Sequence, residues 1–111
     1  MAWKILLFES KRGEKFVEEF IDSLNSKSTA KVIHNIDLLE KFGPRLGMPH
    51  AKILQPNIYE LRIRGTEEIR IFYSFINKNI YLLHGFKKKS QKTPPKEIKT
   101  ALKHLRFLTR I

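Results

Sequence analysis

The chain has 111 residues, a hydrophobic fraction of 41% and a formal net charge of +11, which is the composition of one basic globular domain rather than of a disordered segment. It contains no cysteine, which excludes disulfides, thiolate metal sites and cysteine nucleophiles. Its four histidines lack the spacing of a zinc site and its acidic residues are too scattered for a calcium loop, so we expect no metal and no other cofactor.

The N-terminal segment, residues 3–8, is predicted to form a short strand because it is rich in Ile, Leu and aromatic residues. Its apolar run is too short for the core of a signal peptide or for a membrane span, and charged residues follow it directly. We therefore expect a cytoplasmic protein that does not associate with membranes.

Two amphipathic helices are predicted next. In residues 14–24 the helical spacing places one apolar stripe on Phe16, Val17, Phe20, Ile21 and Leu24. The second helix is expected to begin with Ser26 or Ser28 as its cap and to stop at Gly43-Pro44. Its inward stripe is predicted to be Val32, Ile33, Ile36 and Leu39. Two Gly and two Pro indicate a loop over residues 43–51.

Three strands and a helix complete the predicted order. The strands cover residues 53–64, with a break at Pro56-Asn57, then 68–76 and 80–86, and short turns join them into an antiparallel meander. The final helix is expected to start with Thr93 as N-cap and Pro94 in its first position. Its apolar stripe is Ile98, Ala101, Leu102, Leu105 and Leu108. The order β-α-α-β-β-β-α predicts an α+β fold of one domain, residues 1–111, with the helices packed on one face of the sheet.

Positive charge is concentrated toward the C-terminus. Residues 1–42 hold seven basic and seven acidic side chains, residues 43–83 six and three, and residues 84–111 nine and one, so the three segments carry 0, +3 and +8. Such a field attracts polyanions, chiefly nucleic acid, and also acidic protein partners. The alternative is that the excess lysine serves only solubility.

Strand alternation places Arg62 and Arg70 on one face of the predicted sheet. Because the apolar sets of both strands must share the core face, a three-residue turn pairs Arg62 with Arg70 and Arg64 with Glu68. A turn longer by two residues would make Arg62 and Arg70 diagonal neighbours on the same face. Like charges directly opposite each other are destabilising, and a bound anion would remove that cost. In the alternative interpretation both arginines reach solvent or pair with Glu60 and Glu68.

The segment after the last predicted strand, HGFKKKSQKTP at residues 84–94, adds four lysines at the edge of the same sheet. Lysines in this position can bind phosphates as point charges. The other interpretation is a solvated loop without a ligand.

Residues 58–105 closely resemble the HigB-like, phage-derived branch of the RelE/ParE toxin superfamily. The resemblance is carried by an ELR strand, an R-x-x-Y strand and the segment LLHGFKKKSQKTP that opens a helix. The N-terminal half agrees in its order of one strand and two helices and in the loop GPRLGMPHAKIL.

This resemblance implies a RelE-like fold and the toxin of a type II toxin-antitoxin module, an endoribonuclease that cleaves mRNA on the ribosome without a metal and so inhibits translation. In the implied reaction the 2′-hydroxyl attacks the adjacent phosphate. The reaction needs a base at the 2′-hydroxyl, cations around the phosphorane and an acid for the departing 5′-oxygen.

The resemblance also implies roles for individual residues. Arg62 and Arg70 fall where basic side chains bind the scissile phosphate. Further catalytic roles are implied at the end of the last predicted strand for His84, Lys87 and Lys88, of which the histidine is the natural acid or base because imidazole titrates near neutral pH. Residues expected to bind RNA are Arg64, Lys89, Lys92 and Tyr73.

Two features depart from the expected pattern. Some relatives use a tyrosine in the C-terminal segment, where this chain has Thr93-Pro94-Pro95. Tyr73 is a candidate substitute, but its parity places it on the core face, where a buried structural tyrosine is the alternative. His84 shares the parity of Ile80, Leu82 and Phe86, so a histidine at the edge of the core is its alternative role.

The partners implied are the ribosome, mRNA and a cognate acidic antitoxin, commonly with a helix-turn-helix domain through which operator DNA is bound. We expect the antitoxin to cover Arg62, Arg70 and residues 87–92, or to lie against the neighbouring helices. Two other functions stay open: a ParE-like toxin that poisons DNA gyrase without nuclease activity, and a non-catalytic RNA-binding module. Opposed arginines on a strand face favour the nuclease.

Overall fold

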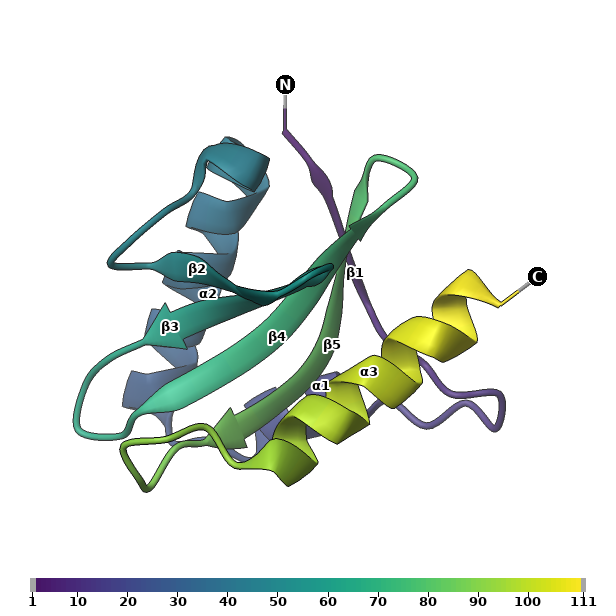
Figure 1. The fold of residues 1–111 in the computed structure, drawn as a ribbon. Coiled ribbons are helices and arrows are strands. Elements are labelled where there is room, and N and C mark those ends of the chain that lie inside the picture. Colours follow the sequence, from purple (N-terminus) through teal and green to yellow (C-terminus); the bar gives the residue numbers. More distant parts are fainter. Residues whose placement is uncertain (1, 111) are drawn as a thin grey trace.

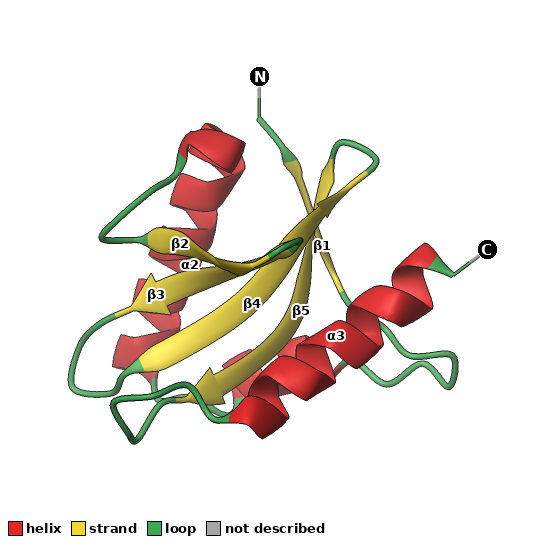
Figure 2. Cartoon of the chain, viewed as in Figure 1, coloured by secondary structure: helices red, strands yellow, loops and turns green. Residues whose placement is uncertain are grey.

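The structure is a computed structural model that describes residues 2–110 (Figure 1). Its elements in chain order are β1 (Lys4–Leu7), α1 (Phe16–Asp22), α2 (Ser26–Phe42), the 3-10 helix η1 (Gly43–Arg45), β2 (Ala51–Gln55), β3 (Ile58–Ile63), β4 (Ile69–Ile76), β5 (Asn79–Lys87) and α3 (Pro95–Thr109). Figure 2 shows the same chain by secondary structure. None of the helices in residues 2–110 has the length and apolar character needed to cross a membrane.

Asn25 separates the first two helices. Its backbone is extended, and its side chain accepts a hydrogen bond of 2.8 Å from the N–H of Ser28, so Asn25 is the N-cap rather than either predicted serine. The apolar stripe of α2 follows the prediction except at Ile33, which is 51% exposed. At the other end Gly43 has a φ of 52°, and a Cβ there would collide with the indole of Trp3.

The strands form one mixed sheet in the order β1-β5-β4-β3-β2. Strands β2 to β5 are an antiparallel meander, as predicted, and β1 is parallel to β5. The predicted strand 53–64 is in fact two strands, because Pro56 and Asn57 make a tight turn in which Asn57 has a φ of 68°. The predicted register between β3 and β4 is confirmed: Arg62 lies directly opposite Arg70.

The helices cover both faces of the sheet, so the expectation that they share one face is wrong for α3 (Figure 1). Helices α1 and α2 pack on one face through a core that includes Val17, Val32, Leu39, Leu61 and Ile71. Helix α3 packs on the opposite face through a second cluster that includes Ile58, Phe72, Leu83, Phe86 and Ala101. The strands carry apolar residues on both faces of the sheet, and each apolar face is shielded from water by a helix layer of its own. The α+β class is confirmed, and the structure has one strand more than the predicted order β-α-α-β-β-β-α.

A β-bulge at Leu83 reverses which face of the sheet the side chains after it in β5 point to. Phe72 pairs with His84 and Tyr73 pairs with Leu82, so Leu83 is the extra residue. The parity of β5 therefore reverses, and His84 faces α3 instead of sharing the face of Leu82. The ring of His104 in α3 forms a hydrogen bond of 2.7 Å through Nδ1 to the carbonyl oxygen of Leu83, which fastens the bulge to the helix.

Candidate functional site

An open pocket of about 550 Å³ lies where β3 and β4 meet the loop that follows β5. It is lined by Arg62, Arg64, Glu68, Arg70, Lys88, Lys89, Ser90 and Gln91. Five of these side chains are cationic and one is acidic, so the pocket concentrates positive potential. An anion is the ligand that this potential attracts.

Arg62 and Arg70 reach this pocket from neighbouring strands because the register opposes them. The backbone of Arg62 is held from both sides: its N–H donates to the carbonyl of His50 at 2.7 Å, and its carbonyl accepts from Nδ2 of Asn35 in α2 at 2.9 Å. Met48, which precedes β2, lies with its Sδ 3.4 Å from Nη1 of Arg62. The position of Arg62 is thus fixed by the sheet and by α2 rather than by the pocket.

Two carboxylates balance the opposed arginines. Oε1 of Glu60 lies 3.8 Å from Nε of Arg62 and 3.7 Å from Nε of Arg70, and Oε1 of Glu68 lies 3.1 Å from Nη2 of Arg70. Arg64 is also near Glu68, with its Nε at 3.9 Å. The pairing of the arginines with Glu60 and Glu68, the alternative considered from the sequence, is therefore present, and it relieves the repulsion between them.

The loop after β5 is tied to the loop between β3 and β4. The N–H of Lys88 donates to the carbonyl of Glu68 at 2.7 Å. Lys88 lines the pocket, whereas the side chain of its neighbour Lys87 lies on the α1/α2 side, 2.6 Å from Oε2 of Glu67. Hydrogen bonds from Lys87 and Ser28 lower the pKa of Glu67. The predicted place of Lys87 in the catalytic set is corrected, because strand alternation points it away from the pocket.

His84 does not line the pocket either. Its Nε2 lies 2.7 Å from Oε1 of Glu97 in the first turn of α3, and both side chains are 18% exposed. The imidazole ring stacks beside Phe86, with ring centroids 5.8 Å apart. The structure therefore places His84 at the junction of β5 and α3, on the face of the sheet that carries Arg62 and Arg70 but outside the residues that line the pocket.

Tyr73 lies in the core and cannot contact RNA, so its predicted role is wrong. The residue is 1% exposed on the α1/α2 face, and its ring stacks on Tyr59 at 5.5 Å. Burial raises the pKa of Tyr73. Lys92 is exposed in the loop before α3 but is not among the residues that line the pocket.

Residues 19–106 match the family described as phage derived protein Gp49-like. The chain belongs to the Gp49-like family. The matched range includes every residue that lines the pocket of this Gp49-like protein, from Arg62 to Gln91. No match to the chain is found among the curated proteins.

Sequence reasoning did not assign Glu60, Glu68, Ser90 and Gln91 to the site of the Gp49-like protein. The sequence does indicate a place for the two glutamates, because strand alternation puts both of them on the same face as Arg62 and Arg70, where they can pair with the arginines. Ser90 and Gln91 lie in a loop whose path no periodic pattern predicts. Within residues 2–110, no three His, Asp or Glu side chains are grouped so that they could hold a metal ion.

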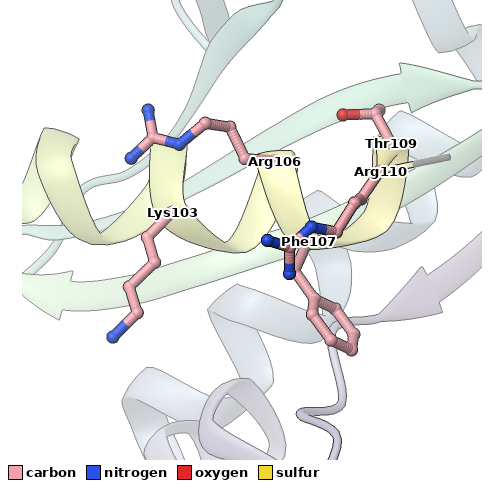
Figure 3. Close-up of a pocket in the computed structure, with 5 residues that line it drawn as sticks. All are labelled: Lys103, Arg106, Phe107, Thr109 and Arg110. Atoms are coloured by element: carbon pink, nitrogen blue, oxygen red, sulfur yellow. The ribbon is translucent and has the colours of Figure 1, made fainter.

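A second basic pocket of the Gp49-like protein, about 470 Å³, lies at the C-terminal end of α3. Lys103 and Phe107 point to one side of the helix, and Arg106 and Thr109 point to the other, while Arg110 follows its last turn (Figure 3). All the lining residues come from α3 and the residue after it, so the sheet contributes none. This pocket adds positive field, but its side chains lack the opposed-strand arrangement that fixes Arg62 and Arg70.

Proposed function

We propose that this Gp49-like protein is the toxin of a type II toxin-antitoxin module and that it cleaves mRNA on the ribosome without a metal. The observation that carries the proposal is the pocket in which Arg62 and Arg70, opposed across two strands, meet Arg64, Lys88 and Lys89. Membership of the Gp49-like family and the resemblance of residues 58–105 to HigB-like toxins support the toxin assignment.

The pocket fits the charge changes of this reaction. The 2′-hydroxyl gives up its proton to solvent water, its oxygen bonds to phosphorus, the bond from phosphorus to the 5′-oxygen breaks, and the 5′-oxygen takes up a proton. Negative charge develops on the phosphorane, and fixed cations such as Arg62 and Arg70 stabilise it most strongly in the transition state. Lys88 or Lys89 supplies the proton to the departing oxygen. The residues described around the pocket offer no imidazole or phenol, so stabilisation by cations is their main contribution.

Induced expression in a bacterial host tests the proposal through the 5′ ends of cellular mRNA. Wild-type protein should arrest growth and create new 5′ ends within translated regions, and a drug that keeps ribosomes off mRNA should abolish these ends. Arg62→Ala should create few ends, whereas Arg106→Ala, which removes the same charge from α3, should behave like wild type. Growth arrest with DNA-damage signalling and no new ends would identify a gyrase poison instead.

A non-catalytic RNA-binding module is the second candidate, and the lining of the pocket favours it in one respect. The described pocket holds cations but no histidine or tyrosine for proton transfer. This function predicts RNA binding that weakens steeply with salt, with neither growth arrest nor new mRNA ends.

The proposed toxin acts in the cytoplasm, where ribosomes are, and is held inactive by an acidic antitoxin. Carboxylates of the antitoxin would pair with the cations of the pocket and block access of mRNA. A helix-turn-helix domain on the antitoxin would bring the complex to operator DNA. The association rate of toxin and antitoxin should fall as salt rises, and an association rate independent of salt would rule out charge steering.

A further inference from the structure

The two carboxylates beside the arginines differ in access to solvent. The side chain of Glu60 is 2% exposed and is enclosed with Arg70, whose side chain is also 2% exposed. The side chain of Glu68 is 40% exposed and lines the pocket. An anion that enters the pocket can therefore displace Glu68, whereas Glu60 stays in place.

Glu68 occupies the cationic groups that an entering anion would need. Its Oε1 lies 3.1 Å from Nη2 of Arg70, within hydrogen-bond distance, and 3.9 Å from Nε of Arg64. A carboxylate and a phosphodiester each present two oxygens and one negative charge, and arginine binds both with the same geometry. Glu68 thus accepts from Arg70 a hydrogen bond that a phosphodiester could accept instead, and it contributes only attraction between charges at Arg64.

Glu60 makes a different kind of contact. Its Oε1 lies 3.7 and 3.8 Å from the Nε atoms of Arg70 and Arg62, distances too long for hydrogen bonds. Oε2 of Glu60 and both Nε atoms are buried without a hydrogen-bond partner. Glu60 therefore neutralises the two arginines and holds them side by side without occupying their hydrogen-bond donors.

We infer that Glu68 is a resident substitute for a phosphodiester of the ligand and competes with it for Arg70 and Arg64, whereas Glu60 is a positioning residue that keeps Arg62 and Arg70 together. The inference rests on the anion-binding part of the proposed function and not on cleavage. It predicts effects of opposite sign for two carboxylates in one site. Removing the charge of Glu68 strengthens binding, and removing the charge of Glu60 weakens it.

The test measures binding of a short, fluorescent 2′-O-methyl oligoribonucleotide by anisotropy at one ionic strength. This probe has no free 2′-hydroxyl, so it cannot be cleaved by the proposed reaction. The variants are Glu68→Gln, Glu60→Gln and, as the matched control, Glu40→Gln on the exposed surface of α2. All three raise the net charge equally, so the control measures the general gain in attraction for a polyanion.

Glu68→Gln should bind the probe about three- to tenfold more tightly than Glu40→Gln, because the charged hydrogen bond to Arg70 no longer competes. Adding Arg70→Lys, which keeps a cation beside Glu60 but removes the guanidinium group that Glu68 contacts, should remove most of that gain. Equal affinities of Glu68→Gln and Glu40→Gln would overturn the role of Glu68. Because Glu68 is partly exposed, the substitution leaves the core intact.

Glu60→Gln should bind about fivefold more weakly than Glu40→Gln, with folding checked by circular dichroism. Binding by folded Glu60→Gln as tight as by the control would overturn the positioning role. If Glu60→Gln does not fold, Glu60→Asp, which keeps the charge but shortens its reach, should bind more weakly than wild type, whose net charge it shares. If the Glu68 effect is found while cleavage is absent in cells, the proposed nuclease fails and the inference stands.

Discussion

His84 of β5 and Glu97 of α3 are joined by a hydrogen bond of 2.7 Å between Nε2 and Oε1. This bond fastens the first turn of α3 to the strand whose end leads into the cationic pocket. The contact gives His84 a structural role at the junction of sheet and helix, while its role in proton transfer stays a prediction.

We therefore predict that His84→Ala lowers the free energy of unfolding by about 1–3 kcal/mol, because Glu97 loses its partner in a partly buried place. mRNA cleavage by the folded variant should fall less than about tenfold. Arg62→Ala should lower cleavage by about a hundredfold or more, as expected when a charge-stabilising group is removed. Denaturant unfolding and mapped mRNA ends measure both. Loss of cleavage in His84→Ala with unchanged stability would instead make the imidazole catalytic.

Arg70→Ala should be among the most destabilising substitutions of a charged residue in the chain. It leaves Glu60 buried beside Arg62 alone, and breaking a buried pair costs about 3–5 kcal/mol. Arg64→Ala is the control, because Arg64 is 61% exposed and should cost less than about 1 kcal/mol. Urea unfolding of both variants checks the difference. Similar midpoints would show that the buried pair contributes no more than a surface pair.

Replacing Lys87 or Lys88 by alanine gives two variants with the same net charge, so a difference between them reports the position of the lost charge. Lys88→Ala should weaken binding of the 2′-O-methyl oligoribonucleotide and lower the slope of log affinity against log salt by about 1. Lys87→Ala removes the same charge from a side chain that pairs with Glu67 on the other side of the sheet, so it should bind close to wild type. Anisotropy titrations at several salt concentrations give both slopes. Equal losses would mean that the probe senses only total charge.

His104 should make stability depend on pH. Burial lowers its pKa below the ordinary value of about 6.5, against the opposing effect of its hydrogen bond to Leu83. Below pH 6.5 the unfolded chain therefore binds a proton that the folded chain does not, so the free energy of unfolding falls as pH drops from 6.5 toward the lowered pKa.

His104→Phe, which can still stack on Phe8 but cannot be protonated, should lose less stability than wild type on acidification from about pH 7.5 to about pH 5.5. His34→Gln, a change on the exposed face of α2, should keep the pH dependence of wild type. Denaturant unfolding at both pH values measures it. A His104→Phe profile parallel to that of wild type would assign the pH dependence to other groups.

The sequence was sufficient to predict the opposition of Arg62 and Arg70. Alternating apolar residues fix the parity of both strands and so the shared face of the two arginines, and of the two registers that the turn allowed, the structure has the one that a three-residue turn gives. The stripe of α3, from Ile98 to Leu108, was likewise predictable from helical spacing.

The side of the sheet on which α3 packs was not predictable from its own stripe. Phe72 and Leu83 lie on the face of the sheet that α3 covers, opposite the face covered by α1 and α2. In a strand whose other apolar residues alternate, a single apolar residue on the other face gives little indication that a helix packs there. The sequence does not predict the β-bulge at Leu83 either, because the bulge depends on tertiary contacts such as the hydrogen bond between His104 and the Leu83 carbonyl. The facing of His84 and of Lys87 could not be derived without it.

The bulge at Leu83 also bears on how the lysine run tolerates change. One residue more or fewer in β5 would exchange the two sides of the sheet for everything that follows, and a pocket served by a single lysine would lose its cation. Lys87, Lys88 and Lys89 are consecutive, so a slip by one position would still present an ammonium group to the pocket. The repetition makes the charge at this rim robust to small insertions and deletions upstream. Arg62 and Arg70 each lie between two apolar residues in the sequence, so a slip by one position would replace either cation in the pocket with an apolar side chain.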